Sequence, residues 1–287
     1  MLDTSDANNQ EIKIGIFGGS GFYNLMDNMQ EIEMETPFGK PSDKIMIGKI
    51  VGKKVAFLPR HGKNHQFPPH KIPYKANLWA MKSLGVQKII SPIAVGSLQA
   101  NIKPGDFVVC DQYINWTGNR GLNQRDDTYY HGELIDGIHK SERVAHFTNA
   151  LPYCEETRKI INNILDEENI SYHKTGTVVV IEGPRFSTQA ESKFFSNQGW
   201  HIINMTAYPE IPLARELGMC YVNIGLVTDY DAGLENDPSI QPVTSEEIIK
   251  VFNNNNQKIK ELIFKIIERI PQEIKCNCEK HIESAII

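Results

Sequence analysis

The sequence has no long hydrophobic run and no concentration of basic residues. No window approaches the roughly eighteen uninterrupted apolar residues of a membrane helix, and residues 1–11 lack the apolar stretch of a secretory signal. The formal net charge is -5, with Lys and Arg scattered along the chain. No basic stripe is therefore present to neutralise nucleic-acid phosphates. We expect a cytoplasmic protein that binds neither membranes nor nucleic acids.

Cysteine is scarce and poorly spaced for a disulfide framework or a metal site. The five cysteines stand at positions 110, 154, 220, 276 and 278, and an odd count at wide spacing favours neither. Cys276 and Cys278 are separated by one residue, whereas zinc knuckles use two or more. We therefore expect reduced thiols and no bound metal.

Several motifs of nucleotide-using and metal enzymes are also absent. The glycines at 15, 18, 19 and 21 lack the spacing of a dinucleotide site, and neither a Walker A lysine motif nor a kinase signature occurs. His61, His65 and His70 have no HExxH pattern, and Pro68-Pro69 prevents a helix from aligning their rings. Transfer from a nucleoside triphosphate is unsupported, and metal binding by these histidines is the weaker interpretation.

Short apolar runs alternate with helical patterns, which predicts an α/β fold with a largely parallel or mixed sheet. With no linker in its 287 residues, the chain is expected to form one domain over 1–287, with a flexible end at 1–11 and a tail at 271–287. Residues 112–151 have no clean period, which is typical of a functional segment or an interface. The predicted strands are 13–17, 44–50, 54–58, 88–93, 106–111, 176–182, 202–204 and 220–227. The predicted helices are 73–84, 155–168, 188–198, 209–217 and 245–270, with a capping box at the start of 188–198.

Polar, charged or aromatic residues follow several of these strands, at the ends where open α/β sheets bind ligands. The Val/Ile run of 176–182 breaks at Gly183-Pro184 and leads into Phe186 and Ser187. By itself this segment is better explained as a strand end that packs its Phe into the core. It becomes informative because other strand ends carry comparable residues.

Two strand ends have the chemistry of anion binding. The strand 13–17 runs into a glycine-rich turn containing Ser20, whose hydroxyl and neighbouring amides can hold phosphate, although a purely structural turn is about as common. The strand 54–58 runs into Arg60 and His61. Arg can grip phosphate with a bidentate fork, and His beside it can donate to an anion.

Two further strand ends suit a nucleoside. Met205 and Thr206 follow the strand 202–204 and offer an apolar wall beside a hydroxyl. Asp229 and Asp231 follow the strand 220–227; a desolvated carboxylate has a raised pKa and can donate a proton, although a surface pair capping a loop is the commoner case. As a set, these strand ends fit an enzyme that brings phosphate to a nucleoside.

In this order along the chain, the segments resemble the trimeric purine nucleoside phosphorylase family. The resemblance extends from about residue 13 to about residue 262 and rests on the segments 18–21, 36–43, 60–62, 94–98, 181–187, 204–206 and 228–231. It implies a mixed sheet, partly closed into a barrel and flanked by helices, in a homotrimer or a dimer of trimers. It also implies reversible phosphorolysis of 5'-methylthioadenosine, with inorganic phosphate as co-substrate and no metal or organic cofactor.

The resemblance also implies roles for individual residues of this sequence. Phosphate would be bound at positions matching Ser20, Arg60, His61, Ile93, Ala94 and Thr206. At 93, family members often have Thr or Ser, so the Ile here removes one side-chain contact. Met205 would lie under the ribose, Phe186 and Ser187 would line the purine pocket, and Asp229 with Asp231 would recognise the base, Asp229 as its proton donor. His146 would reach the 5'-substituent in the neighbouring subunit's site.

Alternatives remain open at this point. The enzyme could act on adenosine, inosine, guanosine or methylthioinosine. Residues 232–242, beside the Asp pair, differ from many relatives, which leaves the preference between a 5'-methylthio group and a 5'-hydroxyl open. A carboxylate at 229 and none at 187 favours 6-aminopurines. A non-catalytic nucleoside-binding protein is the alternative of another class. The C-terminal tail with Cys276 and Cys278 resembles one in archaeal members where cysteines form bridges.

Overall fold

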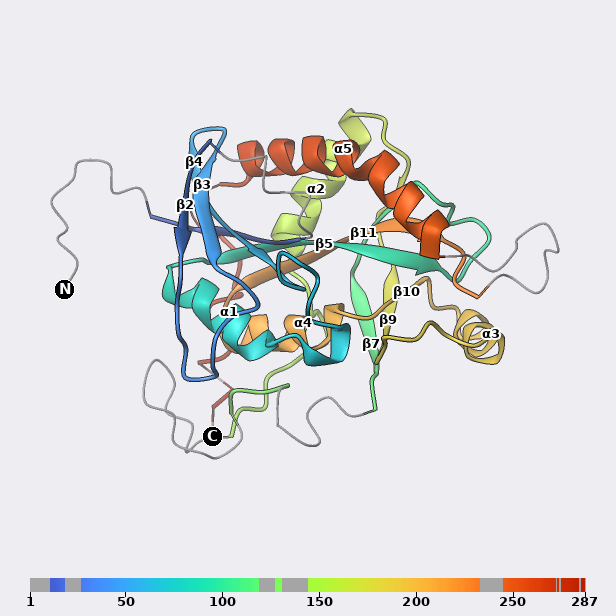
Figure 1. The fold of residues 1–287 in the computed structure, drawn as a ribbon, viewed down its shortest axis with the longest axis horizontal. Helices are drawn as coiled ribbons and strands as arrows, with labels where there is room; N and C mark the ends of the chain where they lie inside the picture. The colour runs from blue at the N-terminus through green and yellow to red at the C-terminus, as the bar shows by residue number, and fades with distance from the viewer. Residues whose placement is uncertain are drawn as a thin grey trace, which may run out of the picture.

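The computed structural model describes residues 11–18, 27–118, 127–130, 144–232, 245–271, 273, 275–283 and 285–286. These residues form the predicted α/β fold, a large mixed sheet flanked by helices (Figure 1). The strands are β1 (Ile14–Gly18), β2 (Asp27–Ile32), β3 (Ile45–Ile50), β4 (Lys53–Pro59), β5 (Lys88–Ser97), β6 (Phe107–Val109), β7 (Gln112–Trp116), β8 (Tyr172–His173), β9 (Thr177–Ile181), β10 (Ile202–Asn204) and β11 (Cys220–Asp229). The helices are η2 (Pro69–Lys71), α1 (Tyr74–Ser83), α2 (Glu155–Glu167), α3 (Gln189–Asn197), α4 (Ala207–Glu216) and α5 (Ser245–Arg269).

Strand β5 organises the sheet. One of its edges pairs in parallel with β11 along most of its length. The other edge pairs in parallel with β1 at residues 88–90 and antiparallel with β10 at residues 96–97. Because β1 and β10 approach from opposite directions, their carboxyl ends, together with that of β4, meet beside the middle of β5.

Helices cover both faces of the sheet (Figure 1). α1 and α4 pack on one face, and α2 and α5 pack on the other. Neighbouring residues of β1 show the division: Phe17 belongs to the core under α1 and α4, and Ile16 to the core under α2 and α5. A strand buried on both faces requires this alternation.

The helices lie close to their predicted bounds, and the predicted capping box of α3 is present between Thr188 and Glu191. The strand predictions differ from the structure in several places. The sequence predicted neither β2 nor β8. Residues 112–116, placed in the irregular segment, form the edge strand β7, and β5 continues to Ser97 instead of ending at 93. Pro92 is tolerated inside β5 because it stands between the β1 and β10 pairings, where that edge has no partner among the described residues.

Among the described residues, no helix has both the length and the apolar character needed to span a bilayer.

Candidate active site

The middle of β5 is exposed at one residue, Ala94, within an otherwise buried strand. Its neighbours Ile93 and Val95 are 4% and 2% exposed and pack into the core under α1 and α4. The Ala94 carbonyl accepts a hydrogen bond from Asn204 Nδ2 at 3.1 Å. The exposed residue Ala94 therefore lies where the ends of β1, β4 and β10 meet, and Ile93 packs into the core.

Arg60 follows β4 and lies almost completely buried, 4% exposed. Its Nε and Nη2 donate to the Glu210 carboxylate at 2.6 and 3.0 Å. Nη2 also donates to Ser91 Oγ at 2.5 Å, and Nη1 donates to the Pro92 carbonyl at 3.4 Å. Burial lowers the pKa of Arg60, but the adjoining Glu210 carboxylate more than offsets this and raises it above its ordinary value. The fork expected to grip phosphate is thus taken up by Glu210.

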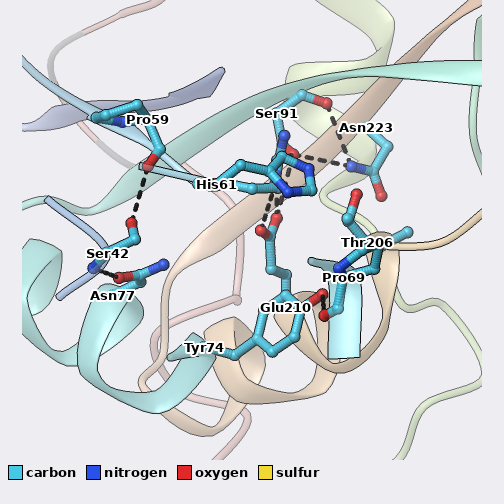
Figure 2. Close-up of polar contacts among 12 residues, drawn as sticks. Ser42, Pro59, His61, Pro69, Tyr74, Asn77, Ser91, Thr206, Glu210 and Asn223 are labelled. Carbon is cyan, nitrogen blue, oxygen red and sulfur yellow. Dashed lines mark hydrogen bonds and ion pairs between the residues drawn. The ribbon is translucent and has the colours of Figure 1, made fainter. Parts of the chain in front are cut away.

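The Arg60–Glu210 pair belongs to a larger buried polar network, of which Figure 2 labels Glu210, Ser91 and Asn223. Tyr221 donates its hydroxyl to Glu210 at 2.5 Å, and Asn223 Nδ2 donates to Ser91 Oγ at 3.0 Å. Both residues belong to the buried strand β11. The network fixes the guanidinium at the carboxyl ends of the strands, beneath the exposed Ala94 backbone.

Burial keeps the His61 ring neutral, and a hydrogen bond fixes its tautomer. Burial lowers the pKa of His61 to about 4; the nearby Arg60 and His65 also lower it, and the hydrogen bond to Phe67 opposes them. Nδ1 lies 2.8 Å from the Phe67 carbonyl. Since a carbonyl can only accept, Nδ1 carries the proton, and Nε2 of the neutral ring can accept a hydrogen bond from a ligand.

The turn from β10 into α4 is built on Asn204. Its Oδ1 accepts from the backbone N–H groups of Thr206 and Ala207 at 2.6 and 2.7 Å, as a cap at the start of α4. Its Nδ2 donates to Ala94. Asn204 therefore ties Thr206, which is 5% exposed, to the exposed point of β5, and Figure 2 shows Thr206 beside the buried network.

The carboxylates of Asp229 and Asp231 lie at the end of β11, each less than a tenth exposed. Burial raises the pKa of Asp229 to about 6, although hydrogen bonds from Thr228 Oγ1 at 2.6 Å and the Asp231 N–H at 2.7 Å lower it. Burial also raises the pKa of Asp231, which accepts from Ser187 Oγ at 2.5 Å. The structure thus brings Ser187 and the two carboxylates together, and Asp229 is poised to hold a proton near neutral pH.

Gly183 allows the chain after β9 to approach the chain after β10. A Cβ at this position would lie 2.6 Å from Met205 Sδ, and its φ of +66° favours glycine. The Phe186 ring beyond it is 51% exposed. The exposed Arg185 pairs with Glu191 at 2.7 Å.

Two predicted site residues are not placed among the others. Ser20 lies outside the described residues. His146 is exposed, and its backbone N–H donates to the Ala285 carbonyl of the C-terminal segment at 2.9 Å. No recorded contact within the described part of the chain joins His146 to the strand-end residues.

The sequence did not single out the partners of Arg60. Glu210 follows Pro209 in a pattern predicted as helix, and Ser91 and Asn223 stand within apolar strands. A polar residue inside a run that is buried on both faces is the available signal, because such a group requires an internal partner.

Comparison with known proteins agrees with this architecture. The sequence model of the phosphorylase superfamily matches residues 13–268. The chain belongs to the phosphorylase superfamily, so the predicted resemblance is confirmed.

Individual relatives are similar over nearly their whole length. The chain is 49% identical to the S-methyl-5'-thioadenosine phosphorylase of Thermococcus kodakarensis, over 93% of this chain and 96% of that protein. It is 44% identical to the protein of the same name from Nitrosopumilus maritimus, over 96% and 98% of the two chains. Among solved structures, it is similar to the methylthioadenosine phosphorylase of Schistosoma mansoni in complex with adenine, with a TM-score of 0.85 at 34% identity, covering 96% of this chain and 99% of that one.

Proposed function

We propose that this protein catalyses the reversible phosphorolysis of 5'-methylthioadenosine to adenine and 5-methylthioribose 1-phosphate. The observation that carries the proposal is the meeting of three kinds of strand end at one place: Arg60 and His61 after β4, Thr206 after β10, and a carboxylate of raised pKa at the end of β11. Relatives of this name, 44% and 49% identical over more than nine-tenths of the chain, support the choice of reaction.

Phosphate is proposed to bind against the Ala94 backbone, with Ser20, Arg60, His61 and Thr206 around it. The recorded bonds of Arg60 use four of its five N–H groups, two from Nη2 and one each from Nε and Nη1, which leaves one on Nη1 for the anion. A protonated phosphate oxygen can donate to Nε2 of neutral His61. Phosphate held in this way is positioned as the nucleophile, and its charge stabilises the positive charge that develops on the sugar.

Asp229 is proposed as the acid that protonates N7 of the purine as the glycosidic bond breaks. General acid catalysis of this kind contributes about 10²–10⁴-fold to a rate. Its pKa of about 6 keeps part of the population protonated near neutral pH. Asp231 and Ser187 would position the base, with Phe186 against its face and Met205 under the ribose.

Assembly and compartment are further parts of the proposal. We propose a cytoplasmic homotrimer, or a dimer of trimers, that needs phosphate as co-substrate and no organic cofactor. Exposed aromatic rings support subunit contact at the β7 and α3 end: Trp116, Phe186 and Phe194 are 47%, 51% and 46% exposed. The exposed His146 would then complete the neighbouring subunit's 5'-pocket.

Steady-state turnover tests the function directly. The purified chain is given methylthioadenosine, adenosine, inosine and methylthioinosine, each with and without phosphate, and base release is measured. We expect phosphate-dependent release of adenine, fastest from methylthioadenosine. Preferred turnover of inosine or methylthioinosine would assign a 6-oxopurine phosphorylase, and nucleoside binding without any release would assign a binding protein.

A further inference from the structure

Four of the five cysteines converge near the start of β11. Cys154 precedes α2, Cys220 is the first residue of β11, and Cys276 and Cys278 come from the C-terminal segment. Their four sulfur atoms all lie within 4.8 Å of one another. The sequence-based argument against a metal site rested on the wide separation of the cysteines along the chain, but in the fold these residues lie side by side.

We propose that Cys154, Cys220, Cys276 and Cys278 bind one zinc ion as a tetrahedral tetrathiolate. Zinc–sulfur bonds of about 2.3 Å place the sulfurs of a regular tetrahedron about 3.8 Å apart, a separation that lies within the span of this cluster. Two disulfides are the competing arrangement, as the resemblance of the C-terminal tail implies. In the structure no disulfide joins these cysteines, and the Cys220 and Cys276 sulfurs lie 3.2 Å apart, beyond the roughly 2.05 Å of a disulfide bond. A disulfide would also join the sulfurs only in pairs, whereas one metal ion engages all four.

Groups around the cluster suit thiolate ligands. Thr157 Oγ1 donates to Cys154 Sγ at 3.3 Å, and the backbone N–H of Cys278 is placed to donate to the Cys276 sulfur. Hydrogen bonds of this kind fix the orientation of metal-binding sulfurs and spread their negative charge.

A buried cation stands beside the cluster. Arg215 on α4 is 5% exposed and interacts electrostatically with Cys278, Cys154 and Cys220. Its Nε is buried without a hydrogen-bond partner in the described part of the chain. A divalent ion held by four thiolates has two negative charges in excess, and the Arg215 guanidinium supplies a compensating positive charge.

The role of such a closed site is structural. Cys220 is the first residue of β11 and Asp229 the last, so at about 3.3 Å per residue they lie roughly 30 Å apart. The metal would therefore take no part in phosphorolysis. It would fasten the C-terminal segment to the sheet at a place where the chains already touch, since a Cβ at Gly218 would lie 3.2 Å from the Glu279 carbonyl.

Zinc content tests the site. The full chain is expressed in zinc-supplemented medium, purified under reducing conditions and dialysed. The number of zinc ions per chain is then measured by inductively coupled plasma mass spectrometry. We expect one zinc per chain in the parent and its loss in Cys276→Ser/Cys278→Ser. The matched control is Cys110→Ser, because Cys110 is buried outside the cluster and should leave the zinc in place. Circular dichroism checks that each variant is folded.

A second measurement does not depend on variants. The chelator-treated, reduced parent is titrated with cobalt(II), and the intense visible absorption of a tetrahedral tetrathiolate is expected to appear and to disappear when zinc is added. A folded, fully reduced parent that retains no zinc and gives no such spectrum overturns the proposal. In protein purified without reductant, an intact mass lighter by four hydrogens, with one remaining free thiol, overturns it in favour of two disulfides. Neither result bears on phosphorolysis.

Discussion

At the scale of single residues, Arg60 is expected to serve both binding and stability. It is expected to hold phosphate, and it also neutralises the carboxylate of Glu210, which is 1% exposed. Arg60→Ala leaves that carboxylate buried without its cation, which should cost about 3–5 kcal/mol of folding free energy. We also expect the KM for phosphate to rise far more than the KM for the nucleoside.

A double variant separates the two roles. In Arg60→Met/Glu210→Gln the unpaired charge is gone, so denaturant unfolding should show much of the stability recovered, while the KM for phosphate stays high. If the double variant binds phosphate as tightly as the parent, Arg60 is a structural residue only.

Asp229 should impose a pH dependence on the reaction. If the protonated carboxyl donates to N7, kcat/KM for methylthioadenosine should fall as the pH rises through about 6, the pKa given by burial of this group. Asp229→Asn should lose this limb of the profile and shift preference from 6-amino to 6-oxopurines, because an amide can donate to a 6-oxo group. Turnover of the four nucleosides from pH 5 to pH 8 measures both effects. Unchanged turnover of methylthioadenosine by the variant would remove Asp229 from the mechanism.

At the scale of secondary-structure elements, the junction of β10, α4 and β5 depends on Asn204. Asn204→Ala removes the two cap hydrogen bonds to Thr206 and Ala207 and the bond to Ala94. We expect a stability loss of about 1 kcal/mol and a raised KM for phosphate with the nucleoside KM little changed. Asn197→Ala, at the exposed end of α3, is the control. Equal phosphate kinetics in the two variants would show that the junction does not position the anion.

The pairing of β5 with β11 offers a second test. A Cβ at Gly96 would lie 3.0 Å from Asp229 Oδ1 and 3.0 Å from Ile203 Cγ2, whereas a Cβ at Gly118 meets nothing within 4 Å. Gly96→Ala should therefore displace the Asp229 carboxylate, the proposed acid, and lower kcat by about tenfold or more, and Gly118→Ala should be neutral. A Gly96→Ala enzyme of full activity would mean that the carboxylate can shift without consequence.

The sequence predicted the helices and strand ends better than the contacts between residues distant in sequence. Hydrophobic period and capping signals located the helices, and breaks after apolar runs located Arg60, Thr206 and Asp229 at strand ends. The network around Arg60 could not be found in this way, because Glu210 lies 150 residues away and only the sheet order brings the two together. The cysteine cluster was missed for the same reason: no local pattern reports the docking of the C-terminal segment on β11.

At the scale of the whole molecule, β11 reaches both unusual clusters. Asp229 lies at its carboxyl end, and the four thiols gather at its amino end, where the next residue, Tyr221, donates to Glu210 of the Arg60 network. The backbone of His146 belongs with neither cluster: it pairs with the C-terminal segment at Ala285, next to the bridge between Ala145 and Ile286. This pairing can fix the position of the His146 backbone, from which the exposed residue would extend toward a neighbouring subunit.

The proposed ring of three subunits therefore makes activity depend on assembly, and mixing inactive chains tests it. A His146→Ala chain retains Asp229, and an Asp229→Ala chain retains His146, so a mixed trimer contains sites in which both residues are intact. In a cyclic trimer with random assortment from equal amounts, about one quarter of the sites are of this kind.

We expect each variant alone to be nearly inactive on methylthioadenosine and the mixture, after dissociation and reassembly, to approach one quarter of the parent's activity. The doubly substituted chain mixed with Asp229→Ala is the control and should recover nothing, because no subunit in it supplies the acid. Sharing fails if His146→Ala alone matches the parent, or if proven subunit exchange restores no activity. The expected recovery has a physical basis, since an imidazole that closes the neighbour's 5'-pocket excludes water and strengthens the electrostatic interactions around the developing charges.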